Sequence, residues 1–132
     1  MQYILRGFIM QKIPEAELKV MKFIWGKNDN VISKEVIEAM QNEYDWKQTT
    51  TLTLLSRFVK RKFLSAEKID RYTHYKIIIE YRGYLNYVIK DFVNNLHNNS
   101  VGSVFLSLYE DNVLKKEEFE HLIFGEINEC FI

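Results

Sequence analysis

The sequence has little cysteine, proline or glycine: one cysteine, one proline and five glycines in 132 residues. A lone cysteine, Cys130, excludes an internal disulfide framework and a cysteine cluster for zinc or copper, and it suits a reducing cytoplasm. Hydrophobic residues make up 47% and aromatic residues 14%, which excludes a disordered or collagen-like chain. We therefore expect an ordered, helix-rich protein.

No apolar run is long enough to cross a bilayer. The opening MQYILRGFIM is too short, contains Arg6 and is followed by no small-residue cleavage site. We therefore expect no membrane insertion, no secretion and a cytoplasmic location. Met10 begins a credible shorter reading frame, so residues 1–9 are treated as an N-terminal extension outside the fold.

The sequence also lacks the motifs of common enzyme sites. It has no glycine-rich phosphate loop and no nucleophile elbow, and His74, His97 and His121 belong to no metal-binding or catalytic motif. The prediction is a protein that is not an enzyme and that needs no cofactor and no metal.

Net charge is absent as well, but the charges are unevenly distributed. Residues 1–45 carry six basic and seven acidic side chains, residues 46–76 carry eight and two, and residues 77–132 carry four and nine. A local charge of +6 gives a concentrated field that attracts DNA. A solvated lysine-rich surface would have the same composition, so charge alone leaves both interpretations open.

Hydrophobic spacing predicts two helices in the first third of the chain. Residues 14–25 form the first, with Pro14 in the first turn. The second begins at Ser33 as N-cap, and Ile32 and Ile37 have the spacing of a hydrophobic staple. Both helices are short and amphipathic.

A third helix and a hairpin follow. Within residues 46–64 the spacing puts Leu52, Leu55, Phe58 and Val59 on the buried face and basic residues outside. Two strands, 64–69 and 73–79, are joined by a turn at 70–72. Helix, helix, basic helix and hairpin is the order of a winged helix, a helix-turn-helix variant whose hairpin is the wing.

The C-terminal part is predicted to be helical and to pair two chains. Apolar residues recur at helical spacing from Tyr84 to Leu96, and residues 103–110 and 115–130 are predicted as two more helices. Three short helices need a partner surface, and an identical chain is the simplest one. The residues expected at this homodimer interface are Leu85, Val88, Ile89, Phe92, Leu96, Phe119, Leu122 and Ile123.

The fold class is thus mainly α (α+β), with a winged helix-turn-helix domain at residues 10–80 and a helical dimerisation domain at residues 81–132. The segments IPEAELKVMKFIW, SKEVIEAM, DWKQTTTLTLLSRFVKRKFL and YTHYKI resemble the BlaI/MecI family of penicillinase and methicillin-resistance repressors. The resemblance runs from Ile13 to Leu122. Its most specific part is the core of the third helix: Trp46, Thr50, Thr53, Leu54, Leu55, Arg57 and Phe58.

The resemblance implies a homodimeric transcriptional repressor of antibiotic-resistance or related stress genes, bound to palindromic double-stranded operator DNA. Thr50 matches a DNA-contacting threonine and Arg57 an arginine of the motif. Thr49 and Leu52 depart from the family, which has basic residues at both positions, so the operator sequence does not transfer. Arg57 could equally pair with an acidic residue of its own domain. A winged-helix protein–protein adaptor without DNA binding is the alternative function.

The predicted DNA-binding residues come from the third helix and the wing. Those near the helix start are expected at base edges, and the later basic ones mainly at backbone phosphates. They are Lys47, Gln48, Thr49, Thr50, Thr53, Arg57, Lys60, Arg61, Lys68, Arg71 and Tyr72.

Two switching mechanisms are implied by the resemblance. Copper-responsive members carry a C-terminal cysteine cluster, which Cys130 alone does not supply. The penicillinase repressors are inactivated by cleavage of an Asn-Phe bond, triggered by a membrane β-lactam sensor, and Ser107–Leu108 occupies that position here. If a membrane sensor-protease system induces this protein at Ser107–Leu108, we therefore expect a related protease and not one that requires an Asn-Phe bond.

Overall fold

A computed structural model describes residues 4–5, 8–28 and 30–121. The chain divides into two compact units, Met1–Val88 and Ile89–Ile132, so the division falls after Val88 and not after residue 80. The elements of the first unit are β1 (Ile4–Leu5), β2 (Phe8–Ile9), α1 (Glu15–Lys27), β3 (Val31–Ile32), α2 (Ser33–Tyr44), α3 (Gln48–Lys60), β4 (Leu64–Ile69) and β5 (Tyr72–Ile77), followed by the start of α4 (Tyr81–Asp91). This order confirms the predicted winged helix.

The helices begin and end where local chemistry favours it. Pro14 precedes α1, and Glu15 and Glu17 lie in its first turn, where carboxylates interact favourably with the helix dipole. The prediction that Ser33 caps α2 was wrong. Ile32 occupies the cap position because it also ends β3, and its N–H donates to Glu35 Oε1 at 3.2 Å. The Glu35 carboxylate thus accepts from the backbone N–H of the N-cap residue, as the glutamate of a capping box does.

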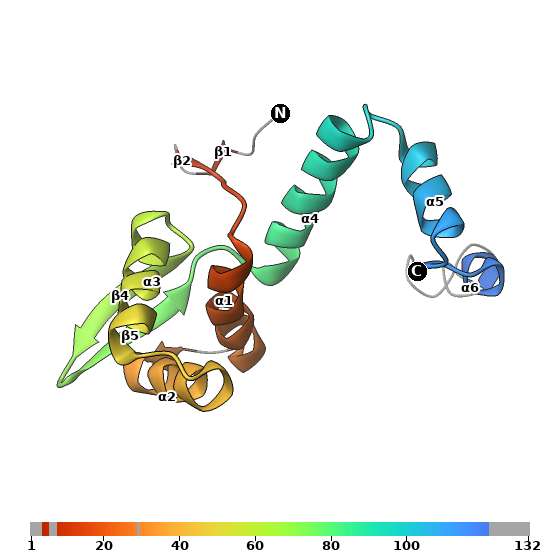
Figure 1. The fold of residues 1–132 in the computed structure, drawn as a ribbon. Helices are drawn as coiled ribbons and strands as arrows, with labels where there is room; N and C mark the ends of the chain where they lie inside the picture. The colour runs from red at the N-terminus through yellow and green to blue at the C-terminus, as the bar shows by residue number, and fades with distance from the viewer. Residues whose placement is uncertain (1–3, 6–7, 29, 122–132) are drawn as a thin grey trace. The chain divides into compact units, whose positions relative to one another are not determined.

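The wing is the β4–β5 hairpin, which belongs to a three-stranded antiparallel sheet of order β3-β5-β4. Ile69 pairs with Tyr72 across a two-residue turn, in which Asp70 has φ 57°, a conformation that aspartate tolerates. The hairpin was predicted, but Tyr72 belongs to β5, which ends at Ile77, two residues earlier than expected. The third strand, β3, was not predicted. Figure 1 shows the β4–β5 hairpin reaching beyond the three helices of this unit.

The core of the first unit lies between these helices and the sheet. Its largest fully buried side chains include Met21, Met40, Phe58 and Phe63. The predicted inner face of α3 was wrong at one position, since Leu52 is 37% exposed. The buried residues of α3 are Thr51, Leu54, Leu55 and Phe58. Successive residues of an α-helix are rotated by about 100° around its axis. Because Thr51 and Leu54 face the core, Leu52 points away from it.

Residues 78–88 are part of the same core. Trp25 Nε1 donates to the carbonyl of Ile79 at 2.9 Å, and Tyr84 and Tyr87 of α4 are buried. The Tyr84 ring lies 5.6 Å from Trp25 and 5.9 Å from Phe63, measured between centroids. The beginning of α4 therefore closes the winged-helix core.

The second unit contains the end of α4, a π-helical turn η1 (Phe92–Leu96), α5 (Val101–Glu110) and α6 (Lys116–His121). The Ser100 hydroxyl caps α5 by accepting from Ser103 N–H at 3.0 Å. Of the predicted helix 115–130, residues 116–121 are helical and residues 122–130 lie outside the described part. Among the described residues, no helix is long and apolar enough to cross a membrane.

Candidate nucleic-acid interface

The exposed face of α3 presents short polar side chains at its N-terminal end. Gln48, Thr49, Thr50 and Thr53 are all exposed, and the first turn holds no acidic residue. The Thr53 hydroxyl donates to the carbonyl of Thr49 at 2.8 Å, so toward a ligand it offers only acceptor capacity and its methyl group. This end of α3 suits an anionic or polar partner.

Leu52 is the apolar member of this exposed face. Sequence reasoning placed it in the core because 52, 55, 58 and 59 also have helical spacing. The buried hydroxyl of Thr51, which has no hydrogen-bond partner among the described residues, occupies the core position instead. Leu52 gives this outer face one apolar side chain among the threonines. In a major groove of DNA, the apolar group that such a side chain can contact is the methyl group of thymine.

A hollow of about 300 Å³ lies along one flank of α3. Its lining consists of Thr49, Thr50, Thr53, Leu54 and Arg57. Threonines of the first two turns thus share a surface depression with an arginine one to two turns further on. The depression is open and shallow, which suits groups at the edge of a larger partner better than an enclosed small molecule.

Arg57 and Arg61 share one carboxylate. Arg57 Nη1 lies 2.8 Å from Glu17 Oε1, and Arg61 Nη1 lies 3.2 Å from Glu17 Oε2. The Glu17 side chain is 9% exposed, whereas those of Arg57 and Arg61 are 52% and 36% exposed. The pairing alternative considered for Arg57 is therefore observed, and both guanidinium groups still reach the surface.

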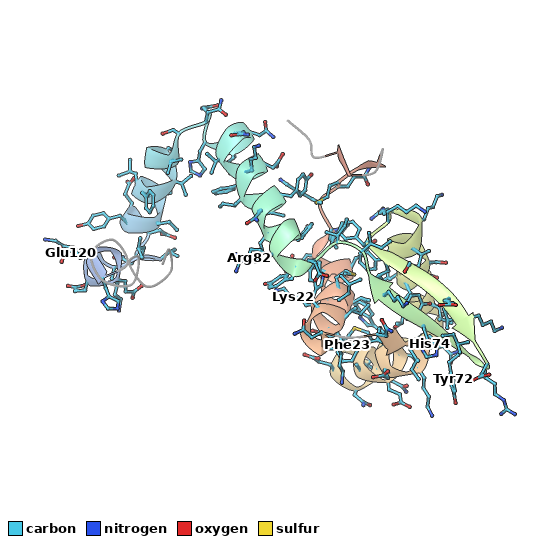
Figure 2. All side chains as sticks on the ribbon, turned by 180° about the vertical axis from the view of Figure 1, so that it is seen from behind. Lys22, Phe23, Tyr72, His74, Arg82 and Glu120 are labelled. Atoms are coloured by element: carbon cyan, nitrogen blue, oxygen red, sulfur yellow. The ribbon has the colours of Figure 1, made fainter. Side chains whose placement is uncertain are left out.

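The wing carries the second group of basic side chains. Lys68 in β4, Arg71 in the turn and Tyr72 in β5 are exposed. Figure 2 shows Tyr72 at the far end of the hairpin, with His74 closer to the helices. Tyr75 is buried at the centre of the sheet, and burial raises the pKa of its hydroxyl. The hairpin therefore has a rigid base and a cationic, aromatic tip.

The eleven predicted DNA-binding residues fall into two groups. Eight lie on α3 or at its ends and three on the hairpin: Lys47, Gln48, Thr49, Thr50, Thr53, Arg57, Lys60 and Arg61, and Lys68, Arg71 and Tyr72. All are exposed except Arg61, which is half-buried. Glu17 and Leu52 were missed. A helical wheel centred on Thr51 would have found Leu52, whereas no sequence pattern links Glu17 to Arg57 across 40 positions.

The predicted interface residues of the C-terminal part are distributed over both units. Leu85 and Val88 are half-buried on the first unit, while Ile89 and Leu96 are 51% and 67% exposed. Phe92 is half-buried, and its ring lies 4.6 Å from that of His97. The side chain of Phe119, together with Leu122 and Ile123, lies outside the described residues.

The remaining predicted site is the Ser107–Leu108 bond. Ser107 is exposed in α5, where its hydroxyl donates to the carbonyl of Ser103 at 3.1 Å, and Leu108 is half-buried. Within the described ranges, no three His, Cys, Asp or Glu side chains come together to hold a metal ion.

Comparison with known proteins gives one consistent result. The family described as penicillinase repressor matches residues 13–124. The penicillinase repressor of Bacillus licheniformis is 33% identical over 116 residues, covering 86% of this chain and 90% of that protein. The methicillin resistance regulatory protein MecI of Mammaliicoccus sciuri is 29% identical over 111 residues, covering 84% and 89%.

The chain is also similar to a solved structure. It is the solution structure of the DNA-binding domain of the repressor BlaI, with a TM-score of 0.51 and 35% identity. The similarity covers 57% of this chain and 94% of that one.

Proposed function

This chain belongs to the penicillinase repressor family, and from that premise we propose that α3 and the β4–β5 hairpin form its operator-binding surface. The chain is a DNA-binding transcriptional repressor and not an enzyme. The adaptor alternative is not favoured, because the matched relatives are repressors. The observation that carries the proposal is the threonine-rich, acid-free N-terminal end of α3, exposed beside a cationic wing.

In the proposed complex, α3 lies in the major groove with its N-terminal half against base edges. Thr49 and Thr50 contribute hydroxyl groups and Leu52 an apolar contact to a thymine methyl group. The cationic side chains farther along the surface, among them Lys60, Lys68 and Arg71, contact phosphates and fix the register of the protein without reading sequence. In this arrangement α3 provides the sequence specificity, and the basic residues provide much of the affinity for DNA.

We further propose that the second unit joins two chains. Its described surface exposes a set of large apolar side chains: Leu96, Val101, Phe105, Leu106, Tyr109 and Val113. A hollow of about 440 Å³ on α5 is lined mainly by apolar residues, among them Phe105, Leu106 and Leu114. So much exposed apolar surface marks an interaction site, and an isologous contact with a second copy covers it on both chains.

Induction by proteolysis is the regulatory part of the proposal. The sequence relationship to the penicillinase repressors suggests antibiotic-resistance or related stress genes as targets, and a membrane sensor-protease system as the trigger. Cleavage at Ser107–Leu108 would remove the last three residues of α5 and everything after it, and with them Tyr109, Val113 and Leu114 of the apolar surface just described. A fragment 1–107 should keep a folded winged helix and lose tight operator binding, because the gain from bivalent binding disappears. Full operator affinity in that fragment would exclude this mechanism.

Operator selection from a random duplex library tests the proposal as a whole. The selected sequences should contain two inverted half-sites whose centres lie about one helical turn apart, since each winged helix of a dimer reads one half-site. Selection of a single, non-repeated site would contradict the dimer, and failure to enrich any sequence would contradict specific binding.

A further inference from the structure

Glu17 is the buried charged side chain closest to the proposed operator-binding surface. It belongs to α1, which contributes no residue to that surface, yet one of its carboxylate oxygens accepts from Arg57 of α3 and the other from Arg61, the C-cap residue of α3. The cluster of Glu17, Arg57 and Arg61 has two positive charges and one negative charge. In this cluster, a buried carboxylate of α1 is paired with two arginines of the proposed operator-binding surface.

The pairing has an electrostatic consequence for DNA binding. An arginine that neutralises a phosphate releases counterions, and this release gives sequence-independent affinity. A carboxylate within 2.8–3.2 Å of both guanidinium groups competes with phosphate for them. The two arginines together should then count as about one phosphate-neutralising charge instead of two.

The pairing also has a geometric consequence. Arg57 lines the same hollow as Thr49, Thr50 and Thr53. The bond from Nη1 to Glu17 holds the guanidinium of Arg57 at the side of this hollow, while its remaining N–H groups stay available to an acceptor. A guanidinium held in this way cannot follow any phosphate that passes α3.

We propose that Glu17 is a positioning residue for operator recognition: by holding Arg57 and Arg61 against α1, it limits their attraction to random DNA and leaves selection to the threonine-rich end of α3. The inference rests on the proposed function, since it assumes that α3 faces DNA. The rival explanation is that Glu17 only fastens α1 to α3. A fastening role would change the melting temperature but not the salt dependence of DNA binding.

Glu17→Gln, with Glu15→Gln as matched control, separates these explanations. Both changes remove one negative charge from the first turn of α1, but Glu15 is exposed and makes no ion pair among the described residues. On random duplex DNA, the slope of log K against log salt should become steeper by about 0.9 in Glu17→Gln. Its affinity relative to wild type should then rise about threefold between ~200 and ~50 mM salt. Its ratio of operator to random affinity should fall, and Glu15→Gln should change neither quantity.

A triple variant, Glu17→Gln with Arg57→Met and Arg61→Met, tests the proposal if Glu17→Gln is unfolded at the assay temperature. It leaves no buried unpaired charge, which makes its folding favourable. Because the cluster contributes about one charge, the triple variant should flatten the wild-type slope by about 0.9. Flattening by about 1.8 would show that both arginines already contact phosphate fully, and it would overturn the proposal.

The remaining outcomes are equally decisive. An unchanged slope in Glu17→Gln, or an equal change in Glu15→Gln, overturns the positioning role and leaves the proposed function intact. Absence of any salt-dependent DNA binding by the wild type contradicts the proposed function and this inference together. Thermal melting followed by circular dichroism verifies that each variant is folded at the assay temperature.

Discussion

The hydroxyl of Tyr84 accepts a hydrogen bond of 2.7 Å from the backbone N–H of Ile13, 71 positions earlier in the chain. The bond joins the segment before α1 to α4, and both residues are buried. It therefore links the two ends of the winged-helix core. The start of α4 belongs to the first unit for this reason, although apolar spacing alone groups it with the C-terminal helices.

Tyr84→Phe should destabilise the first unit, because it leaves the Ile13 N–H buried without its acceptor. The expected loss in free energy of unfolding is about 1–2 kcal/mol, measured by urea denaturation. Tyr81→Phe is the matched control, since Tyr81 of the same helix is 44% exposed and its ring lies 5.0 Å from that of Trp25 at an angle of 38°. Equal effects of the two substitutions would mean that the Tyr84 bond contributes nothing specific.

Stability should fall at alkaline pH. Burial raises the pKa values of Tyr84 and Tyr75 above the ordinary value of 10.0, although the bond from Ile13 partly opposes the rise at Tyr84. A folded-state pKa above the unfolded one gives stability that is complete below pH 10 and is lost as pH rises through the folded value. The free energy of unfolding, followed from pH 8 upward, should show this decline. The decline should be smaller in Tyr75→Phe, and an unchanged decline would exclude Tyr75 as a cause.

Thr51→Val should stabilise the protein. The Thr51 side chain is fully buried, and its hydroxyl has no hydrogen-bond partner among the described residues. Valine has the same shape and removes the desolvated hydroxyl, so the free energy of unfolding should rise by about 1 kcal/mol. Thr50→Val, one residue away and exposed, should leave it nearly unchanged. A destabilised Thr51→Val protein would show that this hydroxyl has a partner in solution.

The sequence predicted the order of elements because each has its own periodicity. The spacing of Met21 and Ile24 indicates a helix, and the turn at Asp70–Arg71 between alternating residues indicates a hairpin. β3 has only two residues, Val31 and Ile32, which is too short for an alternating pattern. Thr51 was missed because a threonine counts as polar in such patterns, although its methyl group packs like that of valine.

The candidate site was predictable only where it depends on neighbouring residues. Exposed threonines and basic side chains of one helix follow from helical spacing, so most of the α3 group could be named in advance. The pairing of Glu17 with Arg57 and Arg61 depends on how α1 crosses α3. That geometry is set by the packing of the whole core and leaves no local trace in the sequence.

Leu96→Glu should weaken self-association. Leu96 is 67% exposed on the second unit, so the substitution costs the folded chain little but places a charge in the proposed dimer interface. Sedimentation at micromolar concentration should show a dimer for the wild type and a monomer for the variant. Lys115→Glu, an exposed polar position of the same unit, is the control. A monomeric wild type would exclude the dimer.

Arg71→Ala and Thr50→Ala, titrated by fluorescence anisotropy on the selected operator and on random duplex DNA over a range of salt, test the DNA-binding surface most directly. Arg71→Ala should weaken binding to both DNAs and flatten the salt slope by about one unit, whereas Thr50→Ala should mainly lower the operator-to-random ratio. Lys22→Ala, an exposed lysine of α1 labelled in Figure 2, should change neither. If Arg71→Ala and Thr50→Ala bind both DNAs as the wild type does at every salt concentration, α3 and the wing are not the surface that holds DNA.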